Sequence, residues 1–397
     1  MYLRRSAGQL IAQQKQLWRH TRSATGIARV ARRAELSTTS YHLTDPDDVP
    51  QGDHLRGDVP RSRNGPLKIF TGRAHPELAR QVAELLGQGV GSASTAAFKN
   101  GETNVEVHES VRDCDVFIVQ PTCNPKPNQY FMELCFLIDA MRRSGASRIT
   151  AVMPIFGYAR QDKQDQRRAP ISARLVCDML AVAGANRVIT IDLHAAQIQG
   201  FASFPMDNLY ALPLIASYIR NTIGTDPKQI VVVAPDAGGA KRADIVAKIL
   251  GCGLALCSKT RSKPNVVDSM RLVGEVEGKT AILVDDMADT MGTLCMAAEL
   301  LKESGAKSVH AAVVHGVLSD PALDRLAESC LDQLVVTDTI PMSITLSDPR
   351  AAKLKVLPIA PMLAGAIQFV HKGLSLAALF RNDDPIKMAA SIKWDSL

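Results

Sequence analysis

The strongest constraint on the fold is an order of strand, helix and strand that occurs twice in the chain. In the first copy, the apolar run 115–120 predicts a buried strand. Residues 131–145 then show helical spacing and end in basic residues and Gly, and residues 148–154 predict the next strand. The second copy assigns the same roles, in the same order, to residues 281–286, 294–305 and 308–316.

Both predicted helices end in the tripeptide SGA, at residues 144–146 and 304–306, and a strand follows each. Strand, helix and strand in series form right-handed βαβ units, which build parallel sheets. We therefore expect an α/β protein with two related domains that divide near residues 205–225. Ligands of such sheets bind beyond the carboxyl ends of the strands, so the loops there are the candidates for chemistry.

The composition fits a soluble globular protein, with 46% hydrophobic and 22% charged residues. No apolar run is long enough to span a bilayer, so we expect no membrane association. The eight cysteines are scattered, without a CxxC pair or a Cys/His ligand spacing. This pattern predicts reduced thiols rather than a disulfide framework or a zinc site.

The formal net charge of +6 is concentrated in a basic leader. Residues 1–34 hold seven Arg and Lys15 without any Asp or Glu, so the remainder carries −2, the difference between +6 and +8. A nucleic-acid partner is not expected, because its basic footprint would lie on the folded body. The Arg-rich, acid-free leader is typical of an organellar transit peptide, with a mitochondrial address expected. A plastid address, or a disordered basic tail on a cytoplasmic protein, are the alternatives.

Packed structure is expected to begin near Leu67, since residues 35–65 are polar and contain several Pro and Gly. The predicted organisation has four parts. They are an extension (1–65), an N-terminal domain (66–213), a C-terminal domain (214–381) and a tail (382–397).

The segment ILVDDMADTMGT (282–293) gathers negative charge where a predicted strand ends. The carboxylates of Asp285 and Asp286 are hydrogen-bond acceptors, suited to a hydrated Mg²⁺ or to sugar hydroxyls. Thr290, Gly292 and Thr293 follow, and amide groups at the start of a helix favour a phosphate. Acids followed by donors describe a site for a sugar phosphate. An ordinary polar loop with a capping Thr would show the same residues.

Two more predicted strands end in acidic residues. Asp236 is followed by Gly238 and Gly239, and then by basic residues that suit a polyphosphate, although Asp236 has a simpler explanation as a helix cap. Asp192 and His194 follow the run before them, and His is a common metal ligand or acid–base group. A structural His is the alternative.

Three further segments carry suitable side chains for a nucleotide. Residues 158–170 form a loop of mixed charge, and residues 258–263 offer cations. In FKNGE (98–102), Phe98 can stack on a base while Asn100 and Glu102 can bind its edge. Each could equally be solvated surface. Together they supply what a Mg·ATP site beside a sugar-phosphate site needs.

These segments resemble one family, the ribose-phosphate pyrophosphokinases, also called phosphoribosyl pyrophosphate synthetases. The resemblance spans residues 67–381. Its motifs here are FKNGE, YARQDK, RAPISA, DLHAAQIQGF, DNLYA, PDAGGAKR, VDDMADTMGT and HKGLSLAALF. It implies two type I phosphoribosyltransferase-like domains, each a mainly parallel sheet flanked by helices. It also implies transfer of the pyrophosphoryl group of ATP to the 1-hydroxyl of ribose 5-phosphate, with Mg²⁺ as cofactor.

The resemblance assigns roles motif by motif. Lys259 and Arg261 would lie on a catalytic loop. The ribose 5-phosphate site would contain Asp285, Asp286, Asp289, Thr290, Met291, Gly292 and Thr293. The ATP site would contain Arg160, Gln161 and Asp165, with Phe98, Asn100 and Glu102 from a neighbouring subunit. The metal ligands would be His194 and Asp236, with Asp192 beside them.

A site shared between subunits implies a homo-oligomer, a dimer-based hexamer in this family, or a hetero-oligomer with paralogous subunits. The family's regulatory site, where inorganic phosphate activates, is matched by Ser110, Arg112, Arg168 and Ser375. Departures from the pattern are Ala196 and Ala377, where Ser is common, and Gln166 in place of a frequent Lys. Activation by phosphate and inhibition by ADP therefore stay open.

Two other functions remain compatible with the fold. One is a non-catalytic regulatory subunit, the synthetase-associated protein, although such proteins tend to lose active-site loops that are intact here. The other is a phosphoribosyltransferase, which would not need the ATP loops.

Overall fold

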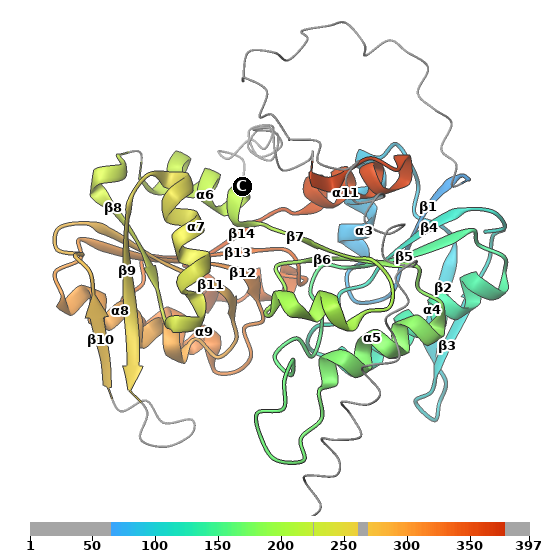
Figure 1. The fold of residues 1–397 in the computed structure, drawn as a ribbon, viewed down its shortest axis with the longest axis horizontal. Helices are drawn as coiled ribbons and strands as arrows, with labels where there is room; N and C mark the ends of the chain where they lie inside the picture. Colours follow the sequence, from blue (N-terminus) through green and yellow to red (C-terminus); the bar gives the residue numbers. More distant parts are fainter. Residues whose placement is uncertain (1–64, 225, 261–268, 378–397) are drawn as a thin grey trace, which may run out of the picture. The chain divides into compact units, whose positions relative to one another are not determined.

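The computed structural model describes residues 65–224, 226–260 and 269–377, which all belong to one compact unit. This part of the chain contains two mainly parallel sheets and a separate two-stranded hairpin (Figure 1). The predicted α/β class is confirmed. The predicted parts 1–65 and 382–397 lie almost wholly outside the described residues, and the boundary at 213/214 stays a prediction.

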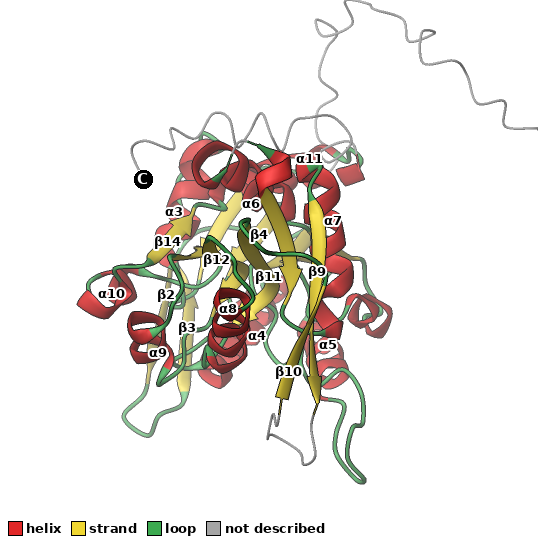
Figure 2. Cartoon of the chain, turned by 90° about the vertical axis from the view of Figure 1, so that its left-hand side faces the viewer, coloured by secondary structure: helices red, strands yellow, loops and turns green. Residues whose placement is uncertain are grey.

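The first sheet has the strand order β1-β4-β5-β6-β7, with every pairing parallel. Helices α3 and α11 lie on one of its faces, and α4 and α5 lie on the other (Figure 1, Figure 2). Its elements are β1 (Leu67–Thr71), α3 (Pro76–Leu85), β4 (Asp115–Val119), α4 (Pro127–Arg143), β5 (Arg148–Met153), α5 (Ser172–Ala183), β6 (Arg187–Ile191), the 3₁₀ helix η1 (Ala196–Phe201) and β7 (Met206–Leu209).

The second sheet has the order β10-β9-β8-β11-β12-β13-β14, and only the β9–β10 pair is antiparallel. Its elements are α6 (Leu212–Tyr218), η2 (Ile219–Ile223), η3 (Pro227–Gln229), β8 (Ile230–Ala234), η4 (Ala237–Gly239), α7 (Ala240–Leu250), β9 (Gly253–Thr260), β10 (Ser269–Val273), β11 (Thr280–Ala288), α8 (Gly292–Glu303), β12 (Ser308–Gly316), α9 (Ala322–Glu328), β13 (Gln333–Thr337), α10 (Ser343–Leu346), η5 (Pro349–Ala351), β14 (Leu354–Leu357) and α11 (Ala360–Lys372).

The repeated sequence order corresponds to a repeated structure. The two SGA turns end α4 and α8, and Gly145 and Gly305 adopt φ of +81° and +85°, a region that favours glycine. The central strands β4 and β8 are buried at every residue, as expected where helices cover both faces of a parallel sheet.

Helix α11 connects the two sheets. It follows β14 of the second sheet, yet packs against α3 of the first. One buried cluster accordingly contains residues of both sheets, including Ile189 and Ile282. At the end of α11, Nδ1 of His371 lies 2.8 Å from Oδ2 of the buried Asp115, and Arg148 donates to the carbonyl of Val370 at 3.0 Å. The two sheets therefore share a core and do not fold as independent bodies within this unit.

The hairpin of β2 (Ala93–Ala97) and β3 (Thr103–Val107) stands apart from both sheets. Strand β3 packs against α4. Residues 98–102 form its tip and are all exposed. The hairpin therefore presents this segment to solvent or to another molecule.

Candidate active site

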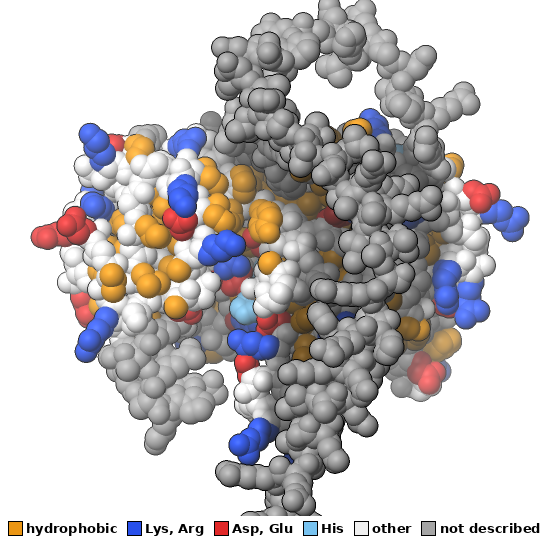
Figure 3. Space-filling model, in the orientation of Figure 1, with side chains coloured by type: hydrophobic (Ala, Val, Ile, Leu, Met, Phe, Trp, Pro, Cys, Tyr) orange, Lys and Arg blue, Asp and Glu red, His pale blue; other side chains and the backbone are white. Residues whose placement is uncertain are grey.

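A polar cavity of about 360 Å³ lies where the carboxyl ends of strands from both sheets meet. On the face shown in Figure 3, basic, acidic and histidine side chains gather near the middle. The cavity is lined by Arg160, His194, Asp236, Gly238, Gly239, Arg242 and residues 285–294. The structure thus brings together acids predicted from separate strand ends.

The acidic pair of the cavity lies within strand β11. The sequence placed the end of this strand at Asp286, but the strand continues to Ala288. Side chains alternate along a strand, so the two neighbouring carboxylates differ in environment. Asp286 is almost fully buried, whereas Asp285 is partly exposed.

Asp286 joins the two halves of the chain through a hydrogen bond with His194. Nδ1 of His194 lies 2.6 Å from Oδ2 of Asp286, and this bond raises the pKa of His194. Burial alone would raise the pKa of Asp286, but the bond from His194 and the charge of Arg242 hold it below its usual value. The lowered pKa favours the ionised form of Asp286, which accepts the hydrogen bond from His194.

Asp285 has the opposite tendency. Burial, and then the charge of Asp286, raise the pKa of Asp285. Arg242 partly offsets this repulsion, since its Nη1 lies 3.6 Å from Asp285 Oδ1 and 3.7 Å from Asp286 Oδ1. The pKa values of the two carboxylates are therefore shifted in opposite directions, and the guanidinium of Arg242 lies near both.

The loop 289–293 leads from β11 into α8. Asp289 accepts a bond from Arg160 Nη1 at 2.6 Å, and Arg325 Nη1 donates to the carbonyl of Thr290 at 2.7 Å. Met291 is buried and adopts φ of +64°, and Gly292 begins the helix. Residues 290–293 all line the cavity, and the start of a twelve-residue helix favours an anion there.

The three predicted metal ligands are divided between two cavities. His194 and Asp236 both line the 360 Å³ cavity, whereas Asp192 lines a neighbouring cavity of about 690 Å³, which His194 also borders. Asp192 is buried, accepts a bond from the amide of Ala211 at 2.7 Å, and has a pKa raised to about 6 by burial. Asp192 therefore lies in the turn that carries His194 and does not line the main cavity.

Asp236 also caps the turn that follows it. Its Oδ1 accepts bonds from the amides of Gly238 at 3.0 Å and Gly239 at 3.3 Å. The capping explanation for Asp236 is therefore correct, and the residue still borders the cavity. Across the described ranges, no three His, Cys, Asp or Glu side chains form a ready-made metal site.

The predicted ATP residues are only partly assembled. Arg160 lines the main cavity and, with Gln161, a third cavity of about 390 Å³. Asp165 is exposed, lies 3.5 Å from Lys163 Nζ, and borders none of these three cavities. At the hairpin tip, Phe98, Asn100 and Glu102 also border none of them, and Asn100 Oδ1 accepts from the amide of Glu102 at 3.1 Å.

The predicted regulatory residues do not line the main cavity, and the predicted catalytic pair is described only in part. The backbone of Lys259 lies in β9, paired with Met270, and Arg261 falls outside the described residues. Ser110 and Arg112 lie between β3 and β4, Arg168 lies in the loop before α5, and Ser375 follows α11, all of them exposed. Their regulatory role stays a prediction.

Sequence reasoning missed two residues that organise the site, Arg325 and His315, and it assigned Arg242 only to a polyphosphate. Arg325 carried no local signal, because its partner Thr290 lies 35 residues away. His315 is the next-to-last residue of β12 and contacts the carbonyls of Ile191 and Asp192. A position near a strand end was the signal that identified His194, and the same signal could have identified His315.

Comparison with known proteins agrees with this geometry. Residues 67–184 match the family model described as the N-terminal domain of ribose phosphate pyrophosphokinase, and residues 257–381 match the phosphoribosyl synthetase-associated domain. "Ribose-phosphate pyrophosphokinase A" of Dictyostelium discoideum is 51% identical over 314 residues, which cover 79% of this chain and 98% of that protein. The chain belongs to the ribose-phosphate pyrophosphokinase family.

Other members of the ribose-phosphate pyrophosphokinase family give the same result. "Ribose-phosphate pyrophosphokinase 2" of Schizosaccharomyces pombe is 50% identical over 316 residues, covering 79% of this chain and 97% of that one. The crystal structure of phosphoribosylpyrophosphate synthetase from Mycobacterium smegmatis superposes with a TM-score of 0.73 at 47% identity, covering 78% of this chain and 99% of that chain. The predicted fold class, two phosphoribosyltransferase-like α/β folds, is confirmed.

In the described part of the chain, no helix has the length and apolar character needed to cross a membrane.

Neutralising Asp285 and neutralising Asp286 should change the free energy of unfolding in opposite directions. Because the pKa of Asp285 is raised, its ionised form destabilises the folded state as pH rises from about 4 through the raised value. Asp285→Asn should therefore increase the free energy of unfolding at pH 8 by on the order of 1–3 kcal/mol, and the gain should vanish near pH 4.

Asp286→Asn is the matched control. The pKa of Asp286 is lowered, so its ionised form stabilises the folded state above about pH 4, and that stabilisation is lost as pH falls further. This variant should lower the free energy of unfolding at pH 8. Urea titrations at pH 4, 6 and 8 measure both effects, and shifts of the same sign at pH 8 would contradict the assigned environments.

Proposed function

We propose that this chain is a ribose-phosphate pyrophosphokinase, which converts ATP and ribose 5-phosphate to AMP and phosphoribosyl pyrophosphate. One observation carries the proposal: a single cavity is lined by residues 285–293 of one half and by His194 and Arg160 of the other. Ribose 5-phosphate fits the first group, with its hydroxyls donating to Asp285 and Asp286 and its phosphate at residues 290–293. The polyphosphate of ATP fits the second.

The reaction needs alignment and charge neutralisation more than covalent chemistry by the protein. The 1-hydroxyl oxygen of the sugar attacks the β-phosphorus of ATP, the bond from that phosphorus to the α–β bridging oxygen breaks, and AMP leaves. The hydroxyl proton is released. Arg160 and Arg242 border the cavity where negative charge accumulates, and Lys259 and Arg261 are proposed to complete the cationic set.

The donor atoms at the cavity fit Mg²⁺, which prefers oxygen ligands and usually binds one or two carboxylates plus substrate phosphates. His194 and Asp236 border the cavity and would hold the ion together with phosphate oxygens of ATP. The bond from Nδ1 to Asp286 fixes the orientation of the His194 ring. When bound, Mg²⁺ neutralises charge on the polyphosphate.

The purified full-length chain should form AMP and phosphoribosyl pyrophosphate in equal amounts from ATP, Mg²⁺ and ribose 5-phosphate. Chromatography of the products measures both. Arg261→Ala should reduce the rate by ~10²–10³, by analogy with losing one oxyanion donor.

Failure to form AMP at any phosphate concentration would reject the synthetase. It would favour the non-catalytic associated subunit of the same fold. Consumption of phosphoribosyl pyrophosphate without ATP would instead identify a phosphoribosyltransferase. The phosphate series also tests whether Ser110, Arg112, Arg168 and Ser375 bind an activating phosphate.

We also propose that the active form is an oligomer in which the hairpin tip completes a neighbour's ATP site. The support is that Phe98, Asn100 and Glu102 are exposed and border none of the three cavities of their own chain. A homo-oligomer built from dimers is proposed, with a hetero-oligomer of paralogous subunits as the alternative.

Mixing two inactive variants tests this sharing of sites. Phe98→Ala and Asp289→Asn should each be nearly inactive alone, and should recover part of the wild-type rate after dissociation and joint reassembly. The recovery arises because some sites receive an intact hairpin and an intact loop. His194→Ala mixed with Asp289→Asn is the control without recovery, since both residues line one cavity of one chain. Absence of recovery in the first mixture would contradict a shared site.

For localisation, we propose that the acid-free leader directs the protein to mitochondria. Its support is the +8 charge of residues 1–34. A fluorescent fusion of residues 1–45 should accumulate in mitochondria, and the same fusion with its seven Arg replaced by Gln should not. A diffuse signal from the unaltered fusion, or a plastid signal, would reject the proposal.

A further inference from the structure

The backbone turn that carries His194 is strained. Asp192, the first residue after β6, adopts φ of +43°, a left-handed conformation that is uncommon for a residue other than glycine. Such conformations persist only where surrounding contacts enforce them. The contacts around residues 191–194 therefore decide whether His194 reaches the cavity.

Part of this enforcement comes from the same half of the chain. The amide of Asp192 donates to the carbonyl of Leu209 at 2.8 Å, and its carboxylate accepts from the amide of Ala211 at 2.7 Å. The amide of Leu193 donates to Asn208 Oδ1 at 3.0 Å. These bonds hold amides and a side chain of the turn, and none of them involves its carbonyl groups.

The carbonyls at the start of the turn are held from the other half, by His315. His315 is the next-to-last residue of β12 and is 2% exposed. Its Nε2 lies 3.1 Å from the carbonyl oxygen of Ile191 and 3.3 Å from that of Asp192. One buried ring nitrogen thus meets two carbonyl oxygens across the boundary between the halves.

The neighbours of His315 assign its tautomer. The carbonyls of Ile191 and Asp192 can only accept hydrogen bonds, so Nε2 of His315 carries the ring proton and donates to them. In the neutral ring, Nδ1 then accepts from the hydroxyl of Thr339 at 2.9 Å. Burial lowers the pKa of His315 to about 4, in agreement with a neutral ring.

His315 and Asp286 lie on neighbouring strands of one sheet. Strands β11 and β12 are parallel, and Met287, the residue after Asp286, pairs with His315. The second sheet therefore holds the turn at two points. His315 holds its carbonyls, while Asp286 holds the imidazole of His194 at 2.6 Å.

We propose that His315 is a positioning residue, which holds the strained 191–194 turn so that His194 meets Asp286 at the cavity. The inference rests on the proposed function and assigns His315 no contact with substrate. Its distinguishing consequence is that His315 acts through His194.

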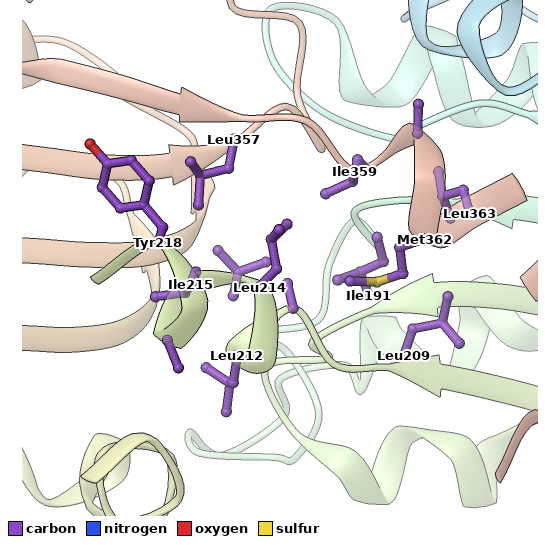
Figure 4. Packing of buried hydrophobic residues seen from close by; sticks show 14 of the residues in the cluster. Ile191, Leu209, Leu212, Leu214, Ile215, Tyr218, Leu357, Ile359, Met362 and Leu363 are labelled. Atoms are coloured by element: carbon purple, nitrogen blue, oxygen red, sulfur yellow. The ribbon is translucent and has the colours of Figure 1, made fainter. Parts of the chain in front are cut away.

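A purely structural role is the competing explanation. Ile191 belongs to the buried cluster shared by both sheets, together with Leu209 and Met362, and this packing could anchor the turn without His315 (Figure 4). The two explanations differ in whether the effects of His315 and His194 are coupled.

A double-mutant cycle in the full-length protein tests the coupling. His315→Leu should reduce kcat by roughly 10–100-fold, the scale of a misplacement of about 1 Å, while KM for ribose 5-phosphate changes less than about threefold. In the His194→Ala background, the same change should cost less than about threefold. If the wild-type enzyme is active and the two substitutions lower kcat independently, so that their effects multiply, the inference is overturned and the proposed function stands.

Two variants guard against simple misfolding. His315→Gln retains an amide donor and should recover much of the rate lost in His315→Leu. His310→Leu is the matched control on the same strand, five residues earlier and paired beside Ile282, and should keep a near-wild-type kcat. If His315→Leu does not fold, Thr339→Val, which removes the donor to Nδ1, takes its place in the cycle.

Hydrogen exchange provides a readout that does not depend on activity. The amides of residues 192–194 should exchange faster in His315→Leu than in the wild type, with a smaller increase in His315→Gln and none in His310→Leu. Unchanged exchange in His315→Leu would overturn the inference even if the wild-type chain formed no AMP.

Discussion

The hydrogen bond between His194 and Asp286 organises the site, because it joins a side chain of the first half to a carboxylate of the second. Four carboxylates border or approach one cavity, which would be unfavourable if each were ionised without a partner. His194 bonded to Asp286, Arg242 beside the adjacent aspartates, and Arg160 on Asp289 offset that repulsion. Two of these three side chains come from the first half and the acids from the second, so the charge balance exists only in the assembled unit.

The parallel topology explains why the contacts between the halves cluster here. The carboxyl ends of parallel strands lie at one edge of a sheet, and the residues after them face whatever lies beyond that edge. His75, which follows β1, contacts the carbonyl of Asp338 after β13 at 3.0 Å. Asn124, which follows β4, donates to the carbonyl of Val317 after β12 at 2.8 Å. The contacts of His194 and His315 obey the same rule, so the polar junction and the cavity are consequences of one arrangement.

Local signals in the sequence predicted this arrangement well, and distant pairings escaped them. The alternation of strands and helices and the acids at strand ends depend on residues a few positions apart, and they located the cavity. The extension of β11 to Ala288 was missed, since it depends on pairing with β12, which no periodicity reveals. Arg325 and His315 act on Thr290 and on Ile191, 35 and 124 residues away, and only the folded chain brings them together. Asp236 shows a third case, because capping and cavity lining use the same side chain and the sequence could not separate them.

The energetics of the resting site favour a ligand that brings cations and hydroxyl groups. Asp285 is held near a second negative charge in a partly buried position, which raises its pKa and leaves it poorly compensated. A hydroxyl that donates to Asp285, or a cation bound beside it, relieves this cost only when the ligand is present. The same carboxylate that lowers the stability of the folded chain would therefore contribute to binding, which is the usual trade between stability and function at such sites. His315 is proposed to act in a similar way, because it holds a strained turn in the conformation in which His194 meets Asp286.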